Sequence, residues 1–192
     1  MIITHYFPYF DKKGIVSNHE LFTSITEYSI QEQQNVVARL KNGSGRALRR
    51  FDQFENYLQR RTQTEQWLYS SFLKMGGKPT SCHPFYFILG KNESLKHDFG
   101  SAAGELILDT AQIDVQDISL TLGDSIGLYF SSAQKRIYSL SEVESLSQNA
   151  IYIQKQMKLL AQHHQYIEVQ LWNKEWLSKS QISDNYILSN IL

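Results

Sequence analysis

Three residues of types that serve sugar and group-transfer chemistry lie on predicted strands of this sequence. His5 falls in an N-terminal strand predicted over residues 2–7, Tyr86 in a central strand and Glu168 in the last long strand. A strand holds its side chains in a set direction, so these positions suit a rigid site better than loop positions would. A carboxylate with aromatic residues beside it can bind a sugar or a cationic intermediate. We expect Glu168 to face a cleft together with His5 and Tyr86.

Alternation within the last strand sets the direction of the Glu168 side chain. One face carries three aliphatic residues that suit a core, Ile167, Val169 and Leu171. The opposite face carries Tyr166, Glu168, Gln170 and Trp172. Because a bare buried carboxylate is costly unless it is paired or solvated, this second face is expected to be either a wet surface or a binding cleft.

The order of these three residues resembles the His-Tyr-Glu arrangement of the ADP-ribosyltransferase superfamily. The likeness rests on Thr4-His5-Tyr6 and on residues 166–171, which are similar to the late strand of its DNA-modifying toxin branch. In that superfamily the His holds the nicotinamide ribose of NAD, the Tyr stacks on the nicotinamide, and the Glu lies over the ribose during transfer. The resemblance implies that His5 and Tyr86 bind NAD and that Glu168 is catalytic.

Basic residues are concentrated in one segment of an otherwise neutral chain. Residues 39–78 hold nine basic and three acidic residues, a balance of +6, and the rest of the chain carries −6. Such a segment can attract phosphates or nucleic acid, although a solvated helix face has the same composition. Five arginines lie off the apolar stripe of the predicted helix and are expected to form an exposed nucleic-acid-binding surface: Arg46, Arg49, Arg50, Arg60 and Arg61.

The elements that position these residues change in kind near Pro84. Helical spacing before it predicts helices over residues 18–40 and 44–75, with a lapse of the apolar stripe across residues 59–66 where Thr62 or Thr64 would cap a second helix. Alternating or continuous apolar runs after it predict strands over residues 85–89, 105–108, 118–122, 126–130, 136–138 and 166–172.

One long helix is predicted before the last strand. Ser141 and Glu144 have the spacing of a capping box, and an apolar stripe follows as far as His164. The sequence therefore predicts an α+β fold: an N-terminal strand and helical segments, then a mainly antiparallel sheet with one long helix before its last strand.

Length and composition limit the classes of protein. The 192 residues fit a single domain over 1–192, and 12% aromatic residues with balanced charge exclude a disordered chain. The single cysteine, Cys82, excludes a disulfide framework and a cysteine-based zinc site, and the histidines show no metal-ligand spacing. No signal peptide or apolar run of membrane length is evident, so we expect a cytoplasmic protein without a membrane partner.

Two functions of different classes are consistent with these observations. The first is an NAD-dependent ADP-ribosyltransferase that acts on nucleic acid or protein. The second is a non-enzymatic interaction protein, such as an antitoxin, an immunity protein or an accessory component of phage defence, in which His5 and Glu168 are structural. The first requires both residues to open into one cleft, and the second does not.

Overall fold

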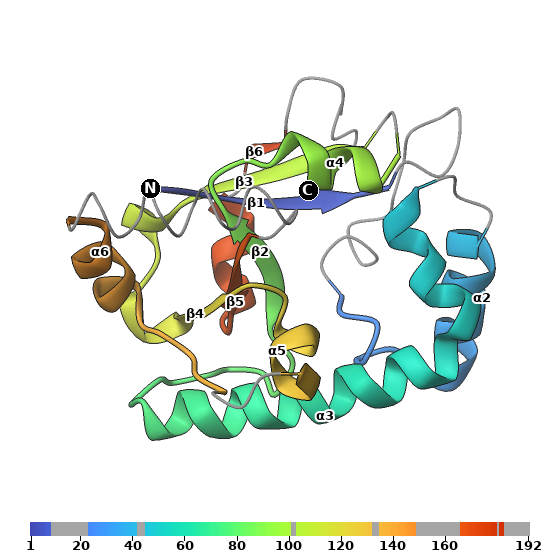
Figure 1. The fold of residues 1–192 in the computed structure, drawn as a ribbon, viewed down its shortest axis with the longest axis horizontal. Coiled ribbons are helices and arrows are strands. Elements are labelled where there is room, and N and C mark those ends of the chain that lie inside the picture. Colours follow the sequence, from blue (N-terminus) through green and yellow to red (C-terminus); the bar gives the residue numbers. More distant parts are fainter. Residues whose placement is uncertain are drawn as a thin grey trace.

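The computed structural model describes residues 1–8, 23–41, 45–100, 103–131, 135–148, 166–179 and 181–182. The described chain has an α+β fold, as predicted, in which helices pack around an antiparallel sheet (Figure 1). Its strands are β1 (Ile2–Phe7), β2 (Phe85–Leu89), β3 (Gly104–Asp109), β4 (Ile118–Leu122), β5 (Ile167–Leu171) and the two-residue β6 (Gln181–Ile182). Its helices are α2 (Ile30–Lys41), α3 (Phe54–Lys74), α4 (Glu93–Asp98), α5 (Ser125–Ser131) and α6 (Leu140–Gln148). Short 3-10 helices are η1 (Arg46–Gln53), η2 (Thr110–Gln112), η3 (Val115–Asp117) and η4 (Lys174–Lys179).

The sheet is divided near its middle, between β1 and β2. The strand order is β4-β5-β2-β1-β3-β6, and every neighbouring pair is antiparallel. All of β1 pairs with β3, but β1 and β2 pair only through Ile3 with Leu89 and Thr4 with Ile88. Figure 1 shows β1 and β3 running across the view while β2 and β5 turn downward. Beyond the Thr4–Ile88 pair, toward His5, β1 and β2 are no longer paired, and the sheet opens there.

The two faces of the sheet differ in chemistry. One face carries the main apolar core, which includes Phe87, Leu106, Leu120 and Val169 and is completed by residues of α6 and η4. The other face packs against α3 along β2 and β5, where Tyr86 hydrogen-bonds with Glu65 and Trp172 stacks on Phe72. It carries polar side chains that are also buried: Thr4, Ser119, Thr121, Glu168 and Gln170. Because both faces are covered, every residue of β5 is buried.

A single continuous helix, α3, replaces the two helices predicted within residues 44–75. The chain enters it through η1 and leaves it at Lys74, before Gly76 with its positive φ of 88°. The predicted break is wrong because the buried face of α3 across the lapse is polar, with Arg61, Thr64 and Glu65 turned inward. Apolar periodicity alone cannot detect a buried polar stretch of helix.

Several smaller predictions are also corrected. Residues 126–130 belong to helix α5, since the Asp124 carboxylate accepts a hydrogen bond from the Gly127 amide (2.7 Å) and caps a helix there. Residues 136–138 form an isolated bridge between Tyr138 and Leu120. The capping box before α6 is Ser139 with Glu142, two residues earlier than predicted. The rest of the predicted long helix, residues 149–165, lies outside the described residues.

The predicted helix over residues 18–40 begins later than expected. Residues 18–22 lie outside the described residues, residues 25–27 form a turn, and α2 starts at Ile30. Ser29 and Glu32 form a capping box there, with the Ser29 amide donating to the Glu32 carboxylate at 2.8 Å. No helix in the described ranges is long and apolar enough to cross a membrane.

Candidate active site

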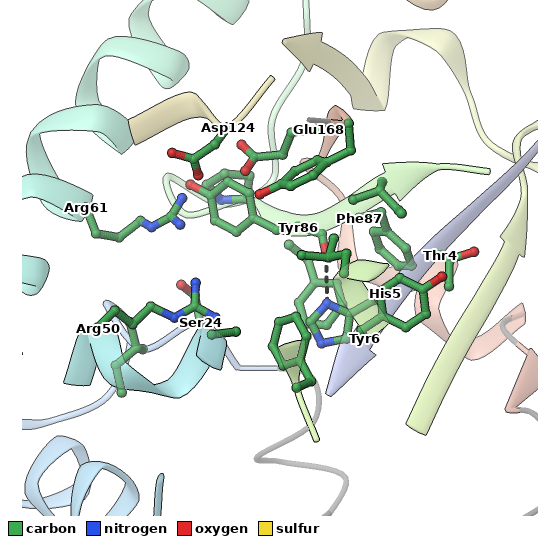
Figure 2. A pocket seen from close by; sticks show the side chains of 18 of the residues that line it. Thr4, His5, Tyr6, Ser24, Arg50, Arg61, Tyr86, Phe87, Asp124 and Glu168 are labelled. Carbon is green, nitrogen blue, oxygen red and sulfur yellow. Dashed lines mark hydrogen bonds between the residues drawn. The ribbon is translucent and has the colours of Figure 1, made fainter. Parts of the chain in front are cut away.

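A cavity of about 240 Å³ lies at the opening of the sheet, between its polar face and the helices η1 and α3. His5 from β1, Tyr86 from β2 and Glu168 from β5 all line it. These are three neighbouring strands in the sheet, although His5 and Glu168 are 163 positions apart in the chain. Figure 2 shows their side chains around the same space, with Arg50 and Arg61 on the helical side.

His5 fills the gap where β1 and β2 separate. Its Nδ1 lies 2.7 Å from the carbonyl oxygen of Tyr86, and because a carbonyl only accepts, Nδ1 carries the proton (Figure 2). The ring packs 4.6 Å from the ring of Phe85 and 5.9 Å from that of Phe87. Burial lowers the pKa of His5 to about 4, so the ring is neutral at pH 7. Its Nε2 is therefore a hydrogen-bond acceptor for a hydroxyl or an amide.

Tyr86 is held at its edge and on one face. Its hydroxyl donates to Oε1 of Glu65 at 3.1 Å, and the guanidinium carbon of Arg61 lies 4.3 Å from the ring centroid. Burial raises the pKa of Tyr86 well above its usual value, so the hydroxyl remains a donor. These two contacts fix the position and tilt of the ring.

Glu65 anchors this arrangement from α3. Its carboxylate is buried, and its Oε2 accepts from the Thr26 hydroxyl and from Nδ1 of His83, both at 2.7 Å. The hydrogen bond to Glu65 raises the pKa of His83. Glu65 thus connects residue 26 with residues 83 and 86, which lie far from it in the chain, behind the wall of the cavity.

Glu168 is a buried carboxylate whose charge is disfavoured by its surroundings. Its side chain is 4% exposed, and burial, followed by the nearby negative charge of Asp124, raises its pKa to about 7. Arg61 and hydrogen bonds from Ser125 and Gln170 act in the opposite direction. Both protonation states of Glu168 are therefore populated near neutral pH, and a raised pKa of this kind marks a candidate functional group.

The face of β5 beside Glu168 is a buried polar network. The Gln170 amide donates to Oε1 of Glu168 and to the Thr121 hydroxyl, both at 3.1 Å, and its carbonyl accepts from the Ser119 hydroxyl at 2.9 Å. Ser119 also accepts from the indole of Trp172 at 2.9 Å. Of the two alternatives predicted for this face, the structure excludes a wet surface, because these side chains are buried. A cavity lies beside Glu168.

The five arginines do not form one exposed surface. Arg46 and Arg49 are exposed, Arg50 and Arg60 are half-buried, and Arg61 is only 5% exposed. Arg61 is turned inward because Tyr57, Tyr86, Glu168 and Glu65 surround it, and they keep its pKa above the usual value although burial disfavours the charge. The prediction of an exposed Arg61 is therefore wrong.

Sequence reasoning missed several residues at the cavity. Asp124 lines it, and Glu65 and Arg61 support Tyr86 from α3. The lapse of the apolar stripe across residues 59–66 could have indicated the two α3 residues. When a long helix carries polar residues on its buried face, those residues must face polar partners or a polar site.

A second cavity, of about 190 Å³, adjoins the first. His5, Tyr6, Arg50 and Phe51 line both cavities, and its far wall is formed by apolar residues of α2 and η1, Val36, Leu40 and Leu48. Arg50 lies at the junction, with its guanidinium carbon 5.5–5.7 Å from the rings of three neighbouring aromatic residues. Among the described residues, no carboxylate comes within 4.0 Å of Arg50 or Arg61.

The described part of the chain holds no cluster of three or more His, Cys, Asp or Glu side chains that would bind a metal ion. No protein-family model, curated protein or solved structure matches this chain.

Proposed function

We propose that this chain is a transferase that splits NAD and passes ADP-ribose to a nucleic-acid or protein acceptor. The observation that carries the proposal is that His5, Tyr86 and Glu168 line one cavity from three neighbouring strands. This is the set of residues that the resemblance to ADP-ribosyltransferases selects from the sequence. Chain order alone does not require the three residues to meet.

The chemistry assigns a role to each of the three side chains. The bond between the ribose and nicotinamide breaks and its electron pair leaves with nicotinamide, while an acceptor lone pair forms the new bond to the same ribose carbon and the acceptor loses a proton. The Glu168 carboxylate stabilises the positive charge on the ribose. Nε2 of His5 accepts a hydrogen bond from a ribose hydroxyl, and nicotinamide packs against the part of Tyr86 that lines the cavity.

The shape of the two cavities supports a dinucleotide as substrate. A dinucleotide consists of two ring systems joined by a diphosphate, and here two adjoining cavities meet at Arg50. A guanidinium without a carboxylate partner is suited to bind the diphosphate through paired hydrogen bonds. The apolar wall of the second cavity suits a purine ring.

The test is release of nicotinamide from NAD by the purified chain, with and without candidate acceptors. We expect turnover that rises with pH through about 7, as Glu168 ionises, and that Glu168→Gln abolishes. Glu55→Gln, which removes an exposed carboxylate on α3, is the matched control and should keep full turnover. If the parent neither binds nor splits NAD, the transferase proposal fails and the interaction-protein function replaces it.

A further inference from the structure

A groove of about 300 Å³ runs along η1 and the first half of α3 toward α5. Arg49, Arg50 and Arg60 line it with one acidic residue, Asp52, and one aliphatic residue, Ile126. Arg50 and Tyr57 line both this groove and the candidate active site, so the two spaces adjoin. Figure 1 shows α5 seated against the middle of α3, which places the far end of the groove beside α5.

The groove ends at a group of aromatic and cationic side chains. The guanidinium carbon of Arg60 lies 4.7 Å from the ring centroid of Phe130, a large apolar side chain that is 44% exposed. The Tyr129 ring lies 4.9 Å from Phe130 at 87° to it and 5.7 Å from the ring of Trp67. Nζ of Lys135 lies 4.2 Å from the Tyr129 ring. Flat apolar faces and positive charges therefore alternate at this end of the groove.

The arginines of the groove have charge to offer a ligand. Among the described residues, none of Arg49, Arg50 and Arg60 has a carboxylate within 4.0 Å, whereas the neighbouring Arg46 pairs with Asp98 at 2.8 Å. An acidic peptide would satisfy these cations but has no flat rings for the aromatic end. A nucleic acid satisfies both, because its phosphates pair with arginines and its bases stack on aromatic and guanidinium planes.

We propose that this groove binds single-stranded nucleic acid and leads one nucleotide toward the cavity of Glu168. A single strand is favoured because the reacting atoms would lie inside a cavity, which a base within a duplex cannot enter without leaving its stack. The role of the bound strand as acceptor of ADP-ribose rests on the proposed function. Binding of the strand itself requires no NAD.

The test is fluorescence anisotropy of a labelled single strand of about 12 nucleotides, titrated with the full-length chain in the absence of NAD. Three phosphate contacts predict that the logarithm of the affinity falls with the logarithm of salt concentration with a slope of about −2. Arg60→Ala and Phe130→Ala should each weaken binding by about tenfold. Phe130→Trp should retain binding, since it keeps a stacking surface. Lys74→Ala, which removes one exposed positive charge in the last turn of α3 away from the groove, is the control and should bind as the parent does.

The inference is overturned if the single strand does not bind, or if Arg60→Ala and Phe130→Ala both bind it as tightly as the parent. It is also overturned if a duplex of the same sequence binds more tightly than the single strand, or if polyglutamate competes as well as an unlabelled strand. Assays of the parent for strand binding and, separately, for release of nicotinamide from NAD distinguish this inference from the proposed function. Strand binding by a parent that splits no NAD supports the groove and refutes the transferase. NAD transfer to a protein acceptor without strand binding refutes the groove alone.

Discussion

Replacing Glu168 by Gln is expected to stabilise the fold while it removes the proposed activity. The parent must hold a carboxylate at a 4% exposed position beside Asp124, and its pKa is raised from 4.5 to about 7. A Gln side chain has nearly the same shape and can still hydrogen-bond with Ser125 and Gln170. It differs chiefly in carrying no charge, so the variant isolates the free-energy cost of the ionised carboxylate.

The size of the effect follows from linkage between proton binding and unfolding. An acid whose pKa is higher in the folded state binds protons more tightly there, so stability falls as pH rises from about 4.5 to about 7 and then stays constant. A shift of this size corresponds to about 3 kcal/mol at pH 8.5 and to less than about 1 kcal/mol at pH 5. The Gln variant does not incur this loss. It should therefore exceed the parent in stability by these amounts.

Urea unfolding of parent and variant at the two pH values measures the difference, followed by tryptophan fluorescence. Glu55→Gln, at an exposed position of α3, controls for the loss of one negative charge and should leave the pH dependence of the parent unchanged. A Gln variant that is no more stable than the parent at pH 8.5 would show that Glu168 is not held in a charge-disfavouring environment. The expected rise of turnover through about pH 7 would then lose its basis.

Three further predictions concern the surroundings of the site. Because Glu65 raises the pKa of His83, the pair stabilises the fold most below about pH 6.5 and loses that contribution as pH rises through the raised pKa. In urea unfolding, His83→Gln should therefore lower the free energy of unfolding more at pH 6 than at pH 9. The pKa of His5 is lowered to about 4, so stability should fall as pH drops from about 6.5 to about 4, and His5→Gln should flatten that part of a plot of thermal midpoint against pH. Trp172 is fully buried and stacks on Phe72 with ring centroids 5.0 Å apart. Trp172→Ala should therefore lower the free energy of unfolding by about 3–5 kcal/mol in a urea titration, and a loss below about 1 kcal/mol would contradict the packing described for this face.

The predicted elements that hold are those set by local pattern. The strands β1, β2 and β4 have the predicted bounds because their apolar runs are short and bordered by turn or loop residues. Residues 126–130 carry an apolar run of similar length, yet they form a helix. There the decisive contact is the cap that Asp124 provides, and a run of five residues does not distinguish helix from strand.

The sequence by itself determined which strand carries each candidate residue and which way the Glu168 side chain points. A period of two fixes direction within a strand, so Glu168 had to lie opposite the aliphatic residues of β5. The chain order of His5, Tyr86 and Glu168 was likewise readable from position alone. These are local properties of backbone geometry.

Only the tertiary structure decided that these residues meet and what surrounds them. The order β5-β2-β1 places their strands side by side, and the short pairing of β1 with β2 opens the cavity between them. The inward direction of Arg61 and Glu65 depends on α3 packing against the polar side of β2 and β5. A polar residue on a helix has the same local pattern whether it faces water or a cavity, and only the packing of distant segments distinguishes the two.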